Sequence, residues 1–155
     1  MGTFTFDPAS GSDIVLSGGS PDICIDLVEG FIGFPELRSR DWIVPRLDGE
    51  QPGNVRLGAL RLTAAGYIKG SGGTPTERRE SFLENVQAVM TALDPSLGLG
   101  TLELAAGYLG LPTGSGAVIP GRVLNAAPGR MQDGQSFQLW TFEFKCYDPA
   151  WEISS

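Results

Sequence analysis

The chain has 155 residues, which predicts one domain, and its 22 glycines and 11 prolines are typical of short strands joined by tight turns. Its net charge of −7 disfavours a nucleic-acid grip, which needs clustered Lys and Arg, and the lack of His excludes His-based triads and His metal ligands. No apolar stretch reaches membrane-spanning length, and the first residues lack the basic and apolar regions of a signal peptide.

The first thirty residues read as short strands separated by turns. Phe4, Phe6 and the apolar run 14–16 predict one or two short strands, followed by a loose turn at 17–21. Residues 23–28 alternate between apolar and smaller or polar side chains, which predicts a half-buried strand. This segment contains Cys24, and the second cysteine, Cys146, lies far away in the sequence. The two could pair in space, but we expect two buried free thiols in a protein made in a reducing compartment.

Residues 35–54 form the least regular stretch, and we predict an extended arm or hairpin there. Charged residues flank an apolar run, and Asp48-Gly49 is a hairpin-turn signal. The arm either covers an edge of the core or reaches a neighbouring subunit. Its aromatic and Arg content is typical of an interface, so we favour the neighbouring subunit. The predicted interface residues are Arg38, Arg40, Trp42, Ile43, Val44, Pro45, Arg46, Asp48 and Gly49.

One helix is predicted, over residues 75–93, after a long strand at 55–69 and a Gly-rich loop at 70–73. Thr74 can cap it, Pro75 suits the first helical position, and Glu77 completes a capping box. Apolar residues at three- and four-residue steps predict one face that packs on a β-sheet. The predicted core residues of this face are Phe82, Val86, Val89, Met90 and Leu93.

The rest of the chain is predicted to be β-structure. We expect strands at 101–108 and 118–126, the second an edge or bulged strand because Pro120-Gly121 interrupts it. Pro128-Gly129 and Asp133-Gly134 are turn signals. The final strand is predicted at 137–146, where apolar and polar residues alternate from Trp140 onward. Its predicted core residues are Trp140, Phe142 and Phe144, followed by Cys146.

No motif in the sequence predicts catalysis. The loop 70–73 before a helix resembles a phosphate cradle, but the last glycine position of that pattern is occupied by Pro75, and Lys69 precedes the loop instead of following it. Glu77, Glu80 and Glu84 follow one helix face, which is typical of a solvated surface. We therefore expect a protein that is not an enzyme and has no cofactor or metal.

The order of these features resembles that of the distal tail proteins of long-tailed bacteriophages. In that family an arm with a V-P-G-R-x-G-like motif precedes a strand, and an aromatic strand ends in a D-P-x-W-like segment. Here the matching stretches are Val44-Pro45-Arg46-Leu47-Asp48-Gly49 and, after 142–147, Asp148-Pro149-Ala150-Trp151. The arm lacks the glycine between Pro45 and Arg46. The chain ends soon after the second stretch, without the second domain of many members, which disfavours a host- or sugar-binding role.

The resemblance implies a mainly β fold, a tail-tube-like β-sandwich with one packed α-helix, in which residues 1–155 form a single ring-forming domain. It also implies a structural virion protein, six copies of which close into a ring at the distal end of the tail tube. The implied partners are further copies of the chain, the tail tube protein and a tail hub or tape-measure protein, with neither a membrane nor specific nucleic-acid binding. The net charge suits a lumen that DNA must pass without sticking.

Two other functions fit the sequence. One is another tail-tube-like component, such as the tube protein or a tail terminator. The other is a small carbohydrate-binding β-sandwich, which would need exposed aromatic side chains, and Trp42, Tyr67, Tyr108 and Trp140 are available.

Overall fold

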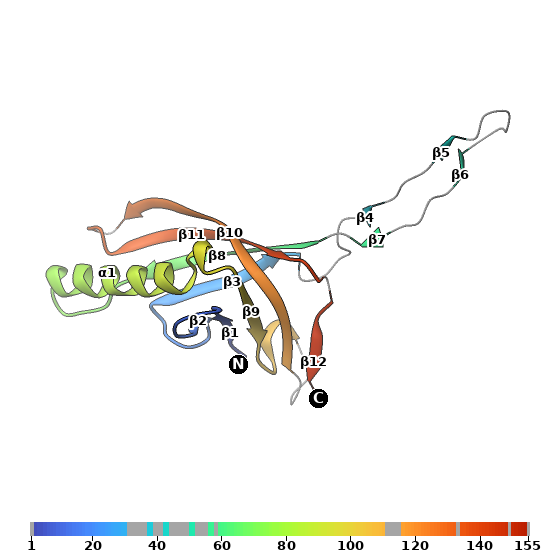
Figure 1. The fold of residues 1–155 in the computed structure, drawn as a ribbon. Coiled ribbons are helices and arrows are strands. Elements are labelled where there is room, and N and C mark those ends of the chain that lie inside the picture. Colours follow the sequence, from blue (N-terminus) through green and yellow to red (C-terminus); the bar gives the residue numbers. More distant parts are fainter. Residues whose placement is uncertain are drawn as a thin grey trace.

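The computed structural model describes residues 2–30, 37–38, 42–43, 50–51, 56–57, 59–110, 116–132, 134–148 and 150–154. Figure 1 shows its elements, which are mostly strands. The strands are β1 (Phe4–Asp7), β2 (Ile14–Ser17), β3 (Ile23–Glu29), β4 (Leu37–Arg38), β5 (Trp42–Ile43), β6 (Glu50–Gln51), β7 (Arg56–Leu57), β8 (Leu60–Lys69), β9 (Leu99–Leu104), β10 (Gly116–Gln132), β11 (Phe137–Cys146) and β12 (Glu152–Ser154). The helices are α1 (Pro75–Ala92) and two short 3₁₀ turns, η1 (Pro95–Leu97) and η2 (Tyr108–Gly110).

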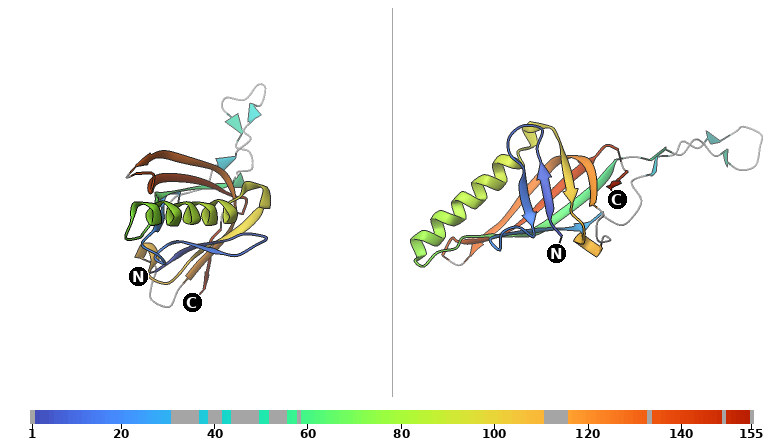
Figure 2. Two further views of the ribbon diagram at one scale, coloured as in Figure 1. Left: turned by 90° about the vertical axis from the view of Figure 1, so that its left-hand side faces the viewer. Right: turned by 90° about the horizontal axis from the view of Figure 1, so that it is seen from below.

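Eight strands form one antiparallel sheet in the order β2-β1-β9-β10-β11-β8-β3, with β12 paired to β10. The long strand β10 changes partners along its length, because residues 117–122 pair with β9 whereas residues 122–132 pair with β11. The sheet therefore bends at β10, and Figure 2 shows the group β1, β2 and β9 facing the group β3, β8 and β11. The predicted mainly β class with one helix is confirmed, and the two layers are halves of one continuous sheet.

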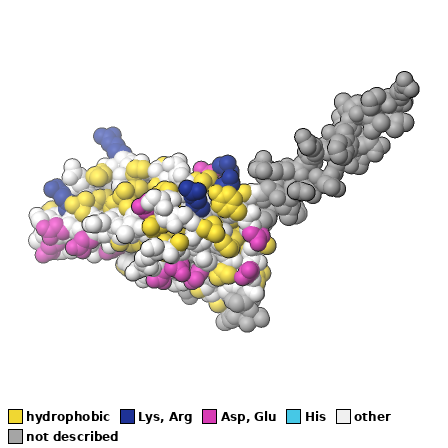
Figure 3. All heavy atoms as spheres, viewed as in Figure 1, with side chains coloured by type: hydrophobic (Ala, Val, Ile, Leu, Met, Phe, Trp, Pro, Cys, Tyr) yellow, Lys and Arg dark blue, Asp and Glu magenta, His cyan; other side chains and the backbone are white. Residues whose placement is uncertain are grey.

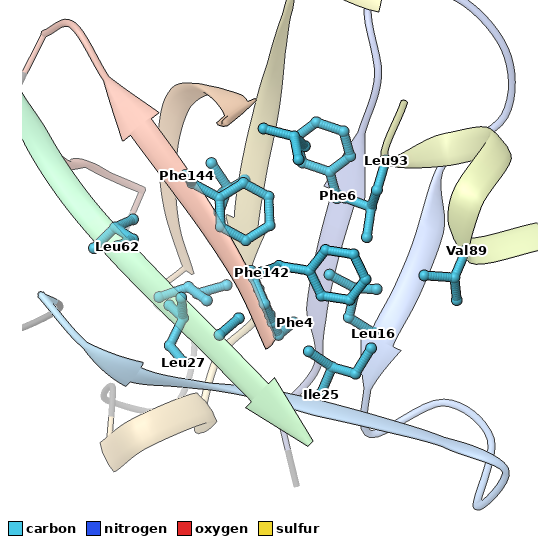
Figure 4. Packing of buried hydrophobic residues seen from close by; sticks show 14 of the residues in the cluster. Phe4, Phe6, Leu16, Ile25, Leu27, Leu62, Val89, Leu93, Phe142 and Phe144 are labelled. Carbon is cyan, nitrogen blue, oxygen red and sulfur yellow. The ribbon is translucent and has the colours of Figure 1, made fainter. Parts of the chain in front are cut away.

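The core lies between these two halves. Alternate residues of β11 point inward, so Trp140, Phe142, Phe144 and Cys146 are buried. The Phe144 ring lies 5.7 Å from the ring of Phe6 across the core. Figure 4 shows the core side chains, which come from both halves of the sheet and from α1.

Helix α1 begins and ends as its sequence predicts, within one residue. The Thr74 hydroxyl accepts a hydrogen bond from the Glu77 amide at 3.2 Å, and the Glu77 carboxylate accepts one from the Thr74 amide at 3.1 Å. Leu93 is the C-cap, and its amide donates to the Val89 carbonyl. The capping box thus fixes the point at which the chain leaves the loop and enters the helix.

The inner face of α1 differs from the predicted one at a single residue. Phe82, Val89 and Leu93 are buried and Val86 is partly buried, but Met90 is 55% exposed. Placing Met90 in the core was therefore wrong. At about 100° per residue, Met90 is rotated by about 80° around the helix axis from Phe82, which places it at the border of the buried face.

One turn and one strand end also differ from the sequence prediction. Strand β9 ends at Leu104, because Gly107 adopts a positive φ of 84° and Tyr108 enters η2. Pro128-Gly129 is no turn but lies within β10, where a register shift between Pro128 and Met131 accommodates it. Pro120 also lies within β10, between the residues that pair with β12 and those that pair with β11. One side of the strand therefore lacks a ladder partner there, which is where a sheet tolerates proline.

Candidate subunit interfaces

The predicted arm, together with β7 just beyond its predicted end, forms two nested antiparallel pairs of short strands. Leu37 and Arg38 of β4 pair with β7, and Trp42 and Ile43 of β5 pair with β6. This nesting is the arrangement of a hairpin, as predicted for 35–54. Figures 1 and 2 place β5 and β6 beyond one end of the sheet, and α1 lies at the other end.

The structure describes only part of the predicted interface set. Arg38, Trp42 and Ile43 belong to described strands. The other predicted interface residues lie outside the described residues, and they are Arg40, Val44, Pro45, Arg46, Asp48 and Gly49. Whether this set forms a subunit contact therefore stays a prediction.

The side of α1 next to its buried face is an exposed apolar surface that the sequence prediction missed. Leu83 is 53% exposed, and Met90, seven residues later, lies on the same side of the helix. Together with Val86 of α1 and with Leu97 of η1 they line an open groove of about 770 Å³, which is also lined by Ser10 and Gly11. We call these four residues the α1 stripe. The spacing of Leu83, Val86 and Met90 was visible in the sequence, but not which apolar residues the sheet would leave uncovered.

Three carboxylates line the groove of the α1 stripe or the groove next to it. Asp94 lines the groove itself, and Glu84 and Asp13 line a second groove of about 590 Å³ beside it. Hydrogen bonds from Ser96 hold the pKa of Asp94 below its usual value, so this carboxylate is charged at neutral pH. Neither groove contains a Lys or Arg among its described lining residues. Figure 3 shows apolar side chains over this end of the molecule, with both acidic and basic ones beside them.

The far half of β10 is a second exposed surface. Every residue from Leu124 to Gln132 is exposed, although the facing part of β11 contains the buried Gln138, Trp140 and Phe142. Beyond Arg122 the side of β10 that faces away from β11 has no strand partner among the described residues. Pro128 and two register shifts interrupt this edge, and such irregularities discourage unspecific strand pairing.

The two outer faces of the sheet differ in charge. On one half, Asp7 of β1, Glu103 of β9 and Glu152 of β12 are exposed acidic residues. On the other half, Arg61 of β8 forms an ion pair of 2.8 Å with Glu143, and Lys145 lies opposite Arg61 in the register. The first face is therefore the one that would repel a polyanion such as DNA.

A polar cluster lies beside the edge strand β3. The Tyr108 hydroxyl donates to the Asp26 carboxylate at 3.0 Å and accepts from the Leu27 amide at 3.1 Å. Burial raises the pKa of Tyr108, and burial together with Asp26 raises the pKa of the Cys24 thiol. Both groups stay protonated at neutral pH, so the cluster offers no activated nucleophile. Its hydrogen bonds instead hold the edge of β3. Nothing in the sequence pointed to this role of Tyr108, because the prediction placed this residue in a strand at 101–108.

The remaining features with possible chemistry have structural explanations. Glu77 accepts hydrogen bonds from the amides of Gly73 and Thr74, so the carboxylate occupies the helix N-terminus where an anion would bind. Cys24 and Cys146 are both free thiols. Within the described ranges, no group of three or more His, Cys, Asp or Glu residues could hold a metal ion, and no helix is long and apolar enough to cross a membrane.

Comparisons with known proteins find similarity in structure alone. No protein-family model matches the sequence, and no curated protein matches it. The crystal structure of the Dit (gp 19.1) protein of phage SPP1, described as a paradigm of the hub adsorption apparatus in phages that infect Gram-positive bacteria, is similar with a TM-score of 0.60 and 16% identity. The similarity covers 96% of this chain and 51% of that one, so the chain spans about half the length of the SPP1 protein.

Two further structures have lower scores. The sheath/tube terminator of PVC, an extracellular contractile injection system, has a TM-score of 0.47 at 5% identity and covers 99% of this chain and 93% of its own. The tube-terminating cap of the anti-feeding prophage has a TM-score of 0.42 at 6% identity, over 97% and 87%. Scores below 0.5 do not establish a common fold. Of the three, the SPP1 protein alone therefore informs the fold, and it is the fold that the resemblance to distal tail proteins implied.

Proposed function

We propose that this chain is a structural virion protein of a long-tailed phage, and that residues 1–155 form one ring-forming domain at the distal end of the tail tube. The observation that carries the proposal is the likeness of almost the whole chain to half of the SPP1 Dit protein. The agreement in element order supports it, since arm, long strand, capped helix and aromatic strand follow one another as in distal tail proteins.

The shape of the chain supports assembly into a ring. Strands β5 and β6 project from one end and the exposed α1 stripe lies at the other, so contacts between copies join unlike surfaces. Such head-to-tail contacts close into rings when the rotation between copies permits it. We propose a ring of six copies in which the arm, with Arg38, Trp42 and Ile43, bridges neighbouring subunits.

The ring would join the tail tube protein to the tail hub or tape-measure protein and let DNA pass through its lumen. The face with Asp7, Glu103 and Glu152 is the described surface best suited to line that lumen, because carboxylates repel phosphates at short range. No catalytic or cofactor role enters this proposal, which needs only assembly and passage.

Two alternatives make different predictions. A tube protein or tail terminator would share the fold but stack on other partners. A carbohydrate-binding sandwich needs exposed aromatic rings, whereas Tyr108 is 6% and Trp140 5% exposed, so two of the four candidate aromatics are unavailable. The burial of these rings favours the structural role over sugar binding.

The test is the mass of the purified chain by light scattering, together with negative-stain images of the same fraction. Closed rings that disappear on Trp42→Ala or on deletion of 38–52, with the chain still folded, would support the proposal. Val28→Ala, which changes an exposed residue of β3, is the control and should leave rings intact. A monomer that also fails to bind tail tube and hub proteins would refute the tail-tip role.

A further inference from the structure

We draw no further inference here: the strongest candidate, the exposed apolar α1 stripe (Leu83, Val86, Met90 and Leu97) with the groove that it lines, carries nothing more, because nothing in the described part of the chain shows what covers it.

Discussion

Replacing Phe82 by Ala should destabilise the fold far more than replacing Met90 by Ala, although both residues belong to the same apolar pattern of α1. Phe82 is 1% exposed and Met90 is 55% exposed. The first substitution leaves a cavity between α1 and the sheet. The second removes atoms that already meet water.

The structure sets the size of the difference. Truncation of a fully buried Phe to Ala typically costs about 3–5 kcal/mol, as lost transfer energy plus the cavity that remains. Surface substitutions usually stay within about 0.5 kcal/mol. A domain has only about 5–15 kcal/mol of stability in total, so Phe82→Ala removes a large part of it.

Urea unfolding of both variants, followed by circular dichroism at a concentration where the chain is monomeric, measures the effect. With a slope of about 2 kcal/mol per molar urea, Phe82→Ala should lower the midpoint by roughly 1.5–2.5 M. In thermal scans it should lower Tm by about 6–20 °C, at some 2–4 °C per kcal/mol. Equal losses for both variants, or a loss below about 1 kcal/mol for Phe82→Ala, would refute the assigned orientation of α1.

Three further predictions concern local contacts. Thr74→Ala should cost about 1 kcal/mol in urea unfolding because it removes the N-cap, whereas Thr74→Ser should restore most of the loss; equal stability of the two variants would contradict the capping role. Tyr108→Phe should cost about 1–3 kcal/mol in the same assay, since it leaves the Leu27 amide and the Asp26 carboxylate without this partner; a variant as stable as the unaltered chain would contradict the clamp on β3. A thiol reagent at pH 8 should label Cys24 but not Cys146 until the protein unfolds, because burial raises the pKa of Cys146 to about 12 and keeps it protonated up to that pH; equal labelling by mass spectrometry would contradict its burial.

Several elements were determined by the sequence nearest to them. Strand β11 follows from the alternation that begins at Trp140 and ends at Cys146, which only an extended chain with one buried face satisfies. Helix α1 starts where Thr74, Pro75 and Glu77 place the capping box. These signals are local. The residues of the capping box lie within four positions of each other, and the apolar residues of β11 recur along a single strand. They could therefore be interpreted without knowing what packs against them.

Tertiary structure decided the rest, because it depends on partners that are distant in the chain. Pro120 is tolerated in β10 because it lies between the residues that pair with β12 and those that pair with β11. The residues next to Pro120 in the sequence do not reveal this change of strand partner. Tyr108 leaves the strand pattern to bond with Asp26 and Leu27, about eighty residues earlier. The same holds for α1. Periodicity determined that Leu83, Val86 and Met90 are apolar neighbours on one helix. Only the packing of α1 in the fold decided that Leu83 and Met90 stay exposed, because a helix can bury only the part of its apolar face that another element touches.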